Sequence, residues 1–275
     1  ALALATAPAT TILVLKETES EGPVTEYTNA LVALNNLASI VLFELLFLAI
    51  YFAGGHLDVP VAVQLGRLIR DLAGSILLGI GGGLVVSYSY TLVTASRRLV
   101  LLAAVIVLIL AVCELQGMPY LLTFLAMGVT VANSSDQTRQ VLAELDRLTG
   151  LLCVVFFVTH GAELQPDKLG EVPLIAVGYV VFRFAGKYLG IRLAARFGSD
   201  EPAVRRWLGT TLVAQAGAAI ALSAIAAHKT EPLPGQLPGT LHLICLHVQT
   251  VILGTVVIFE LIGPILIRQA VIRAG

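Results

Sequence analysis

Apolar runs alternate with short charged or Pro/Gly-rich connectors along the whole chain. This pattern gives nine apolar segments, at residues 1–15, 25–53, 67–95, 99–115, 117–133, 148–164, 172–196, 204–227 and 239–267. Most of them approach the length of about 20 residues that a helix needs to cross the hydrocarbon core of a bilayer. The pattern therefore predicts an all-α, polytopic membrane protein.

The composition supports this class and argues against others. Hydrophobic residues make up 57% of the 275 residues and charged residues only 13%, whereas about 25% of the residues of a typical soluble domain are charged. The 17 basic and 18 acidic residues form no basic run, so we do not expect nucleic-acid binding. Cys113, Cys153 and Cys245 are far apart within apolar runs, which indicates small core residues rather than a disulfide or metal framework.

The basic residues are distributed unevenly between alternate connectors. One side receives eleven of them: Lys16, Arg97, Arg98, Arg139, Arg147, Arg192, Arg196, Arg205, Arg206, Arg268 and Arg273. The other side receives Arg67, Arg70, Lys168 and Lys229. Because basic loops stay in the cytoplasm, the pattern predicts a multi-pass protein of the cell (inner) membrane with a cytoplasmic C-terminus.

Two apolar segments are interrupted near their midpoints by small and polar residues. The interruptions are Thr6-Ala7-Pro8-Ala9-Thr10 and Gln215-Ala216-Gly217-Ala218. An interruption frees N–H and C=O groups that lipid cannot satisfy, so it must face protein or a water-filled cavity. Half-helix ends there present partial charges to an ion or a solute, which makes Thr6, Pro8, Thr10 and Gln215 candidate binding residues. In contrast, the run Gly79-Ile80-Gly81-Gly82-Gly83 indicates close helix packing rather than a phosphate loop.

Adjacent carboxamides, Asn35 and Asn36, lie about 15 Å into the second segment, near the expected bilayer midplane. They are either part of a binding site or hydrogen-bond partners of neighbouring helices. Glu44 lies about 12 Å farther along the same helix. This carboxylate either pairs with a neighbouring helix or lines an outer vestibule.

Arg183 and Lys187 are four residues apart and share one helix face inside an apolar segment. Intramembrane cations are costly and usually functional. A tether to carbonyls or a carboxylate is expected for Arg183, while Lys187 has the alternative of reaching the cytoplasmic surface. Glu163 and Glu260 are expected to make local bonds. His160, His242 and His247 are too scattered for a metal site, and without a hydrolytic triad or a carboxylate pair we expect neither an enzyme nor a cofactor.

Together these residues resemble the monovalent cation:proton antiporter superfamily, in particular its bacterial sodium/proton exchanger branch. The motifs that carry the resemblance are Ala5-Thr6-Ala7-Pro8-Ala9-Thr10, Val32-Ala33-Leu34-Asn35-Asn36, the basic helix from Arg183 to Gly190, the stretch from Val213 to Ile220, and the ending from Val257 to Pro264. They cover essentially the whole chain in the family's order. The resemblance implies transport of a monovalent cation and a proton across the lipid bilayer.

The resemblance also implies an architecture. We expect two crossing discontinuous helices from an inverted repeat, whose N-terminal part would be truncated because the first helices precede this sequence. Residues 1–60 and 171–275 would form a core transport bundle, 61–96 a linker helix and 97–170 a dimerisation bundle. The protein would be a homodimer that alternates between inward and outward states like an elevator.

The chain departs from the family at its acidic pair, where Asn35 and Asn36 replace Asp-Asp or Asn-Asp. Asparagine does not ionise, so the usual competition between cation and proton is absent at this position. Three consequences remain open. In the first, antiport persists: Lys187 binds the proton, and oxygens of Asn35, Asn36, Thr6 and Thr10 bind the cation. In the second, the site takes an anion or an organic solute. In the third, the chain is a non-transporting homologue.

Overall fold

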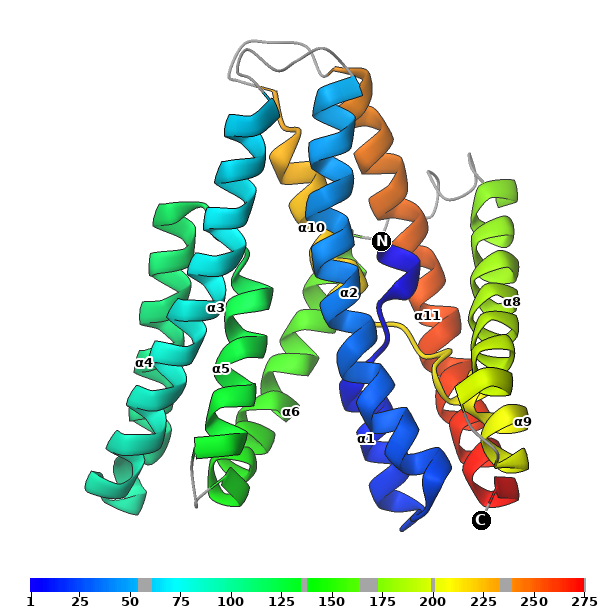
Figure 1. Ribbon diagram of the computed structural model, residues 1–275, viewed down its shortest axis with the longest axis horizontal. Helices are drawn as coiled ribbons and strands as arrows, with labels where there is room; N and C mark the ends of the chain where they lie inside the picture. The colour runs from blue at the N-terminus through cyan, green and yellow to red at the C-terminus, as the bar shows by residue number, and fades with distance from the viewer. Residues whose placement is uncertain (54–60, 135–137, 164–172, 199–200, 233–238, 275) are drawn as a thin grey trace. The chain divides into compact units, whose positions relative to one another are not determined.

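The computed structural model describes residues 1–53, 61–134, 138–163, 173–198, 201–232 and 239–274. Every regular element in these ranges is helical (Figure 1). The elements are η1 (Leu2–Leu4), α1 (Pro8–Glu17), α2 (Pro23–Ala53), α3 (Val61–Leu92), α4 (Ala95–Gln116), α5 (Tyr120–Ser134), α6 (Thr138–Glu163), α8 (Pro173–Gly198), α9 (Pro202–Thr211), α10 (Gly217–Lys229) and α11 (Thr240–Ala274). The predicted all-helical class is confirmed.

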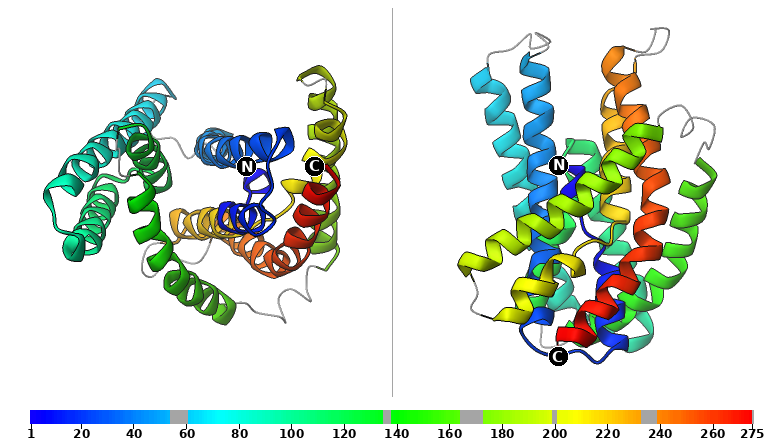
Figure 2. Two further views of the ribbon diagram at one scale, coloured as in Figure 1. Left: turned by 90° about the horizontal axis from the view of Figure 1, so that it is seen from below. Right: turned by 90° about the vertical axis from the view of Figure 1, so that its right-hand side faces the viewer.

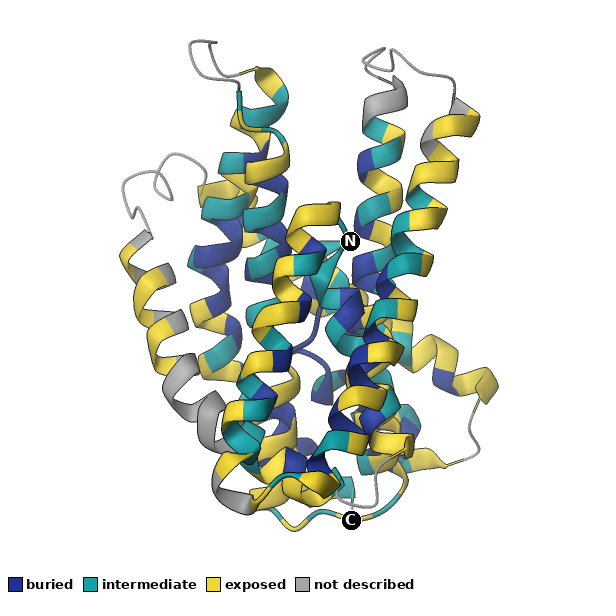
Figure 3. Cartoon of the chain, turned by 90° about the vertical axis from the view of Figure 1, so that its left-hand side faces the viewer, coloured by how far each residue is buried: buried dark blue, intermediate teal, exposed yellow. Residues whose placement is uncertain are grey.

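Five helices within the described ranges are long and apolar enough to cross a bilayer, judged by length and composition. They lie in α2, α3, α4, α8 and α11, and α5 is a shorter apolar helix. Large apolar side chains cover their outer faces, such as Phe182 at 78% exposed and Phe197 at 88%. In Figure 3 the buried residues lie where helices contact one another, while much of the remaining surface is exposed. An apolar exterior of this extent is typical of a protein surrounded by lipid.

The chain forms two compact units whose boundaries fall within α2 and α6. The first unit comprises residues 1–43 and 159–275, and the second comprises residues 44–158. The sequence-based assignment of residues 61–96 to a linker and 97–170 to a dimerisation bundle stays a prediction.

In the second unit, glycines let α3 pack closely on α4 and α5. A Cβ atom added to Gly79 would lie 2.7 Å from Ala126 Cβ, and one added to Gly83 would lie 2.6 Å from Thr130 Cβ. At Gly82 an added Cβ would collide with the side chain of Ile109. The predicted packing role is confirmed for these three glycines, whereas Gly81 faces open space.

In the first unit, two non-helical stretches overlap the predicted interruptions at 6–10 and 215–218, and both begin and end earlier than predicted. Residues 5–7 are non-helical between η1 and α1, and residues 212–216 are non-helical between α9 and α10. Helix α1, which follows the first interruption, begins with Pro8. Proline suits the first helical position because its ring fixes a helical φ and because it has no N–H to leave unpaired there. Helix α10, which follows the second interruption, begins with Gly217. Both views of Figure 2 show α9 beside the last turns of α11, against which it packs.

Candidate functional site

The two interruptions meet in the interior of the first unit. The N–H of Ala7 donates to the carbonyl oxygen of Ala214 at 3.0 Å. Thr6 is 1% exposed and Ala214 is fully buried. Because the unwound backbone is buried here, we expect other protein groups to supply its remaining hydrogen bonds.

Arg183 on α8 supplies bonds to both interruptions. Its Nη1 donates to the carbonyl oxygen of Val213 at 2.5 Å, and its Nη2 donates to that of Ala5 at 2.8 Å. The guanidinium also lies 4.3 Å from the ring centre of Phe259 on α11, in a cation–π contact. The carbonyl tether predicted for Arg183 is therefore present, and one rigid fork holds the two breaks together.

Asn36 on α2 pairs with the backbone of Thr6. Its Oδ1 accepts the Thr6 N–H at 3.2 Å, and its Nδ2 donates to the Thr6 carbonyl at 3.0 Å. The carboxamide therefore replaces both hydrogen bonds that a helix would have given this residue. Asn35 donates more weakly, from Nδ2 to Thr6 Oγ1 at 3.3 Å.

Lys187, one turn after Arg183, turns inward rather than toward the cytoplasmic surface. Its side chain is buried, and Nζ donates to the carbonyl oxygen of Leu4 at 2.6 Å and to Thr6 Oγ1 at 2.8 Å. The alternative that Lys187 reaches the membrane surface is therefore wrong for this structure. The ammonium group is held by oxygen atoms at the first interruption.

Tyr179 completes a series on α8 that sequence reasoning missed. Its hydroxyl accepts from Gln215 Nε2 at 2.7 Å, and the same Nε2 donates to the carbonyl oxygen of Leu2 at 3.0 Å. Tyr179, Arg183 and Lys187 lie four residues apart in turn, so they share one face of the helix. That spacing was the signal that could have identified Tyr179.

Glu260 makes a long-range bond, which corrects the prediction that it bonds locally. Thr10 Oγ1 in the first turn of α1 donates to its Oε2 at 2.8 Å. The other carboxylate oxygen, Oε1, is buried and has no hydrogen-bond partner among the described residues. Pro264, four residues later, has no N–H to give the backbone carbonyl of Glu260 its helical partner. The side chain of Glu260 therefore bonds to another helix, and its backbone carbonyl lacks the usual helical N–H partner.

The remaining sequence candidates lie outside this network. Pro8 is exposed at the start of α1, and Glu44 is half buried on α2, so its role stays a prediction. Cys113 and Cys245 are buried, as expected for small core residues. His242 bonds to Thr230 and His247 to the Leu243 carbonyl. The side chains of Cys153, His160 and Glu163 lie outside the described residues.

Several oxygen atoms gather at the first interruption. Carbonyl and hydroxyl oxygens converge at the first interruption, where the Lys187 ammonium now binds them. Phe259 packs against the Arg183 guanidinium. The next residue, Glu260, bonds to Thr10 in the first turn of α1. Polar and ionisable groups at this depth typically mark the path of an ion or solute.

These features define a polytopic membrane protein with a buried polar network at two interrupted helices. The chain matches the family model described as "Sodium/hydrogen exchanger, transmembrane" over residues 1–272, and it belongs to this family. No curated protein and no solved structure matches it.

Proposed function

We propose that this protein is a secondary active transporter that exchanges Na⁺ or K⁺ for protons by alternating access, with Lys187 in place of the family's acidic group. The observation that carries the proposal is the pair of bonds from Lys187 Nζ to Leu4 O and Thr6 Oγ1. These are the hard oxygen ligands that a small cation prefers. Membership of the exchanger family supports the same general function.

Competition for these oxygens would couple the two fluxes. Protonated Lys187 uses them as hydrogen-bond acceptors, so a metal cation cannot bind them at the same time. When Nζ gives up its proton, the positive charge leaves and the Leu4 carbonyl and the Thr6 hydroxyl become available to a cation. Asn35 is a further candidate ligand, while Asn36 is already bonded to the Thr6 backbone.

Glu260 would supply the carboxylate that the Asn-Asn pair lacks. It bonds to Thr10, four residues beyond Thr6 on the chain, and its second oxygen is buried. A carboxylate beside the first turn of α1 would offset part of the positive charge of a cation bound at the first interruption. We assign Glu260 a charge-compensating role in this proposal.

The assembly and location belong to the same proposal. We propose a homodimer in the cell (inner) membrane, with the eleven-charge side of the chain in the cytoplasm. The predicted charge asymmetry and the exchanger family support this orientation and location.

The test is proton flux in proteoliposomes that contain the full-length protein, challenged in turn with sodium, lithium and potassium. We expect cation-driven flux in the wild type and its loss in Lys187→Gln, which removes the titratable group. Lys16→Gln is the matched control, because Lys16 is exposed on α1. Glu260→Gln is expected to reduce the flux without abolishing it.

The outcomes separate the alternatives. Undiminished exchange in Lys187→Gln would rule out the proposed coupling. A silent wild type with flux gained in Asn36→Asp would identify an intact scaffold that no longer transports.

A second candidate is transport of an anion or organic solute on the same fold. The specific observation in its favour is that Arg183 and Lys187 are both buried and bond to neutral oxygens. Two cations of this kind attract a negative group. Uptake of an anion by the wild type without cation-driven proton flux would establish this function instead.

A further inference from the structure

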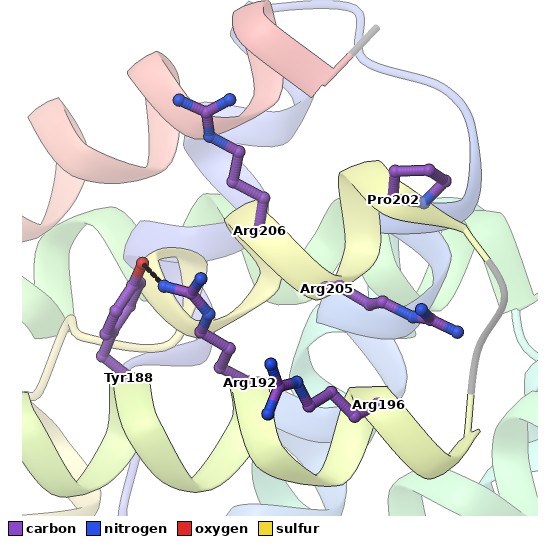
Figure 4. Close-up of a pocket in the computed structure, with 6 residues that line it drawn as sticks. All are labelled: Tyr188, Arg192, Arg196, Pro202, Arg205 and Arg206. Carbon is purple, nitrogen blue, oxygen red and sulfur yellow. Dashed lines mark hydrogen bonds between the residues drawn. The ribbon is translucent and has the colours of Figure 1, made fainter.

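A pocket of about 590 Å³ lies between α8 and α9, separate from the site described above. The residues that line it are Tyr188, Arg192, Arg196, Pro202, Arg205 and Arg206 (Figure 4). Four of these six residues are arginines and none is acidic. The lining of the pocket is therefore basic.

The arginines come from two neighbouring helices. Tyr188, Arg192 and Arg196 are spaced by four residues and so follow one face of α8. On the other side, α9 approaches Tyr188 so closely that a Cβ atom on Gly209 would lie 3.0 Å from Tyr188 Cα. The Tyr188 hydroxyl accepts a bond from Arg192 Nη1 at 3.1 Å, which orients this guanidinium. Figure 4 shows Arg192 and Arg196 pointing into the space between the helices, whereas the side chains of Arg205 and Arg206 extend away from α8.

The start of α9 adds to the positive potential. Pro202 is the first residue of this helix and lines the pocket. The unpaired N–H groups of a helix N-terminus carry a partial positive charge and bind anions. Here the helix end acts together with arginine side chains from two helices.

Trp207 indicates the depth of the pocket in the membrane. It is the only tryptophan of the chain. The guanidinium of Arg206 lies 5.0 Å from its ring centre, and that of Arg273 lies 5.5 Å away. Tryptophan is enriched at the headgroup level of a bilayer. The four arginines of the pocket and Arg273 all fall on the predicted cytoplasmic side.

We propose that this pocket binds a phosphate-bearing anion, supplied either by the headgroup of an anionic phospholipid or by a soluble polyphosphate. Arginine forks match phosphate oxygens and bind them through two parallel hydrogen bonds. Basic pockets between helices on the cytoplasmic side suit anionic headgroups such as that of cardiolipin. This inference does not depend on the proposed transport function, because it concerns binding alone.

The test is native mass spectrometry of the full-length protein in detergent, with cardiolipin, phosphatidylcholine and inorganic pyrophosphate as probes. We expect cardiolipin to bind more tightly than phosphatidylcholine. In Arg192→Gln/Arg196→Gln the affinity for cardiolipin should fall about tenfold for each arginine removed. The matched control is Arg97→Gln/Arg139→Gln, which removes two exposed arginines of the second unit on the same predicted side.

Pyrophosphate identifies the source of the phosphate. Displacement of cardiolipin by pyrophosphate would support a pocket that accepts soluble phosphates, and binding of cardiolipin without displacement would support a headgroup site that needs the lipid chains. Equal loss of affinity in the control, or no loss in Arg192→Gln/Arg196→Gln, would overturn the proposal, as would binding of neither anionic probe. Should the double variant not fold, the single variants Arg192→Gln and Arg196→Gln serve the same comparison.

Discussion

Asn36 illustrates how one side chain can stabilise an unwound membrane segment. A carboxamide has both a donor and an acceptor, so it can pair with the N–H and the C=O of the same residue. The bonds from Asn36 to Thr6 use both groups. A carboxylate in this place could accept from the N–H but could not donate to the carbonyl. In this structure the side chain of Asn36 therefore supports the backbone of the first interruption.

Asn36→Asp should destabilise the protein for this reason. The Thr6 carbonyl would lose its donor in a buried environment, and an unsatisfied buried group costs roughly 1–3 kcal/mol. We expect a lower free energy of unfolding, measured by thermal unfolding of the purified full-length protein. Asn29→Asp on an exposed position of the same helix is the control and should have little effect. Equal stability of Asn36→Asp and the wild type would contradict the pairing.

Arg183 shows the same principle with a charged group. Its two terminal nitrogens reach carbonyls on stretches that lie about 200 residues apart in sequence. Lysine has the charge but not the fork, so it could not span both stretches in the same way. The position therefore depends on the shape of the guanidinium as well as on its charge.

At the scale of elements, α11 supports the second interruption through one small residue. Gly263 faces Ala214, and a Cβ atom added to Gly263 would lie 2.8 Å from Ala214 Cβ and 3.0 Å from Ala214 Cα. Pro264 follows and weakens the helix bonding at Glu260. The pair Gly263-Pro264 thus allows α11 to pass against the unwound stretch and to present Glu260 to α1.

Gly263→Ala should therefore push α11 away from the second interruption. Forcing an extra methyl group into a closely packed contact costs about 1–3 kcal/mol, so we expect a lower unfolding temperature. Gly190→Ala on α8 is the matched control, because nothing lies within 4 Å of an added Cβ there. Alanine at that position should be neutral or stabilise by up to about 1 kcal/mol, since it favours helix more than glycine. Equal unfolding temperatures for both variants would argue against the contact.

At the scale of the whole molecule, the eleven-to-four distribution of basic residues makes a prediction about orientation. In a cysteine-free background, Glu231→Cys should react with a membrane-impermeant maleimide in intact cells, while Glu21→Cys should react only after the membrane is opened. Both positions are exposed in the structure, so accessibility depends on the side of the membrane. The reverse labelling pattern would show that the chain is inserted the other way.

Much of the site could be predicted from the sequence because its cause is local. Interrupted apolar segments, adjacent asparagines and two cations four residues apart are visible without any partner. The bonding pattern could not be predicted in this way. The sequence favours local bonds for Glu260, because nothing in it points to Thr10, 250 residues away. It also leaves open whether Lys187 turns toward the protein interior or toward the membrane surface.

The sequence by itself determined the class of protein, the helical segments and the places where two of them break. Hydrophobic length and backbone hydrogen bonding impose these features on any chain in a bilayer. Only the tertiary structure decided which groups satisfy the broken backbone: Arg183 for both stretches, Asn36 for Thr6, and Lys187 for the oxygens of Leu4 and Thr6. A polar side chain in an apolar interior must find a partner, but packing of distant helices determines which partner lies within reach.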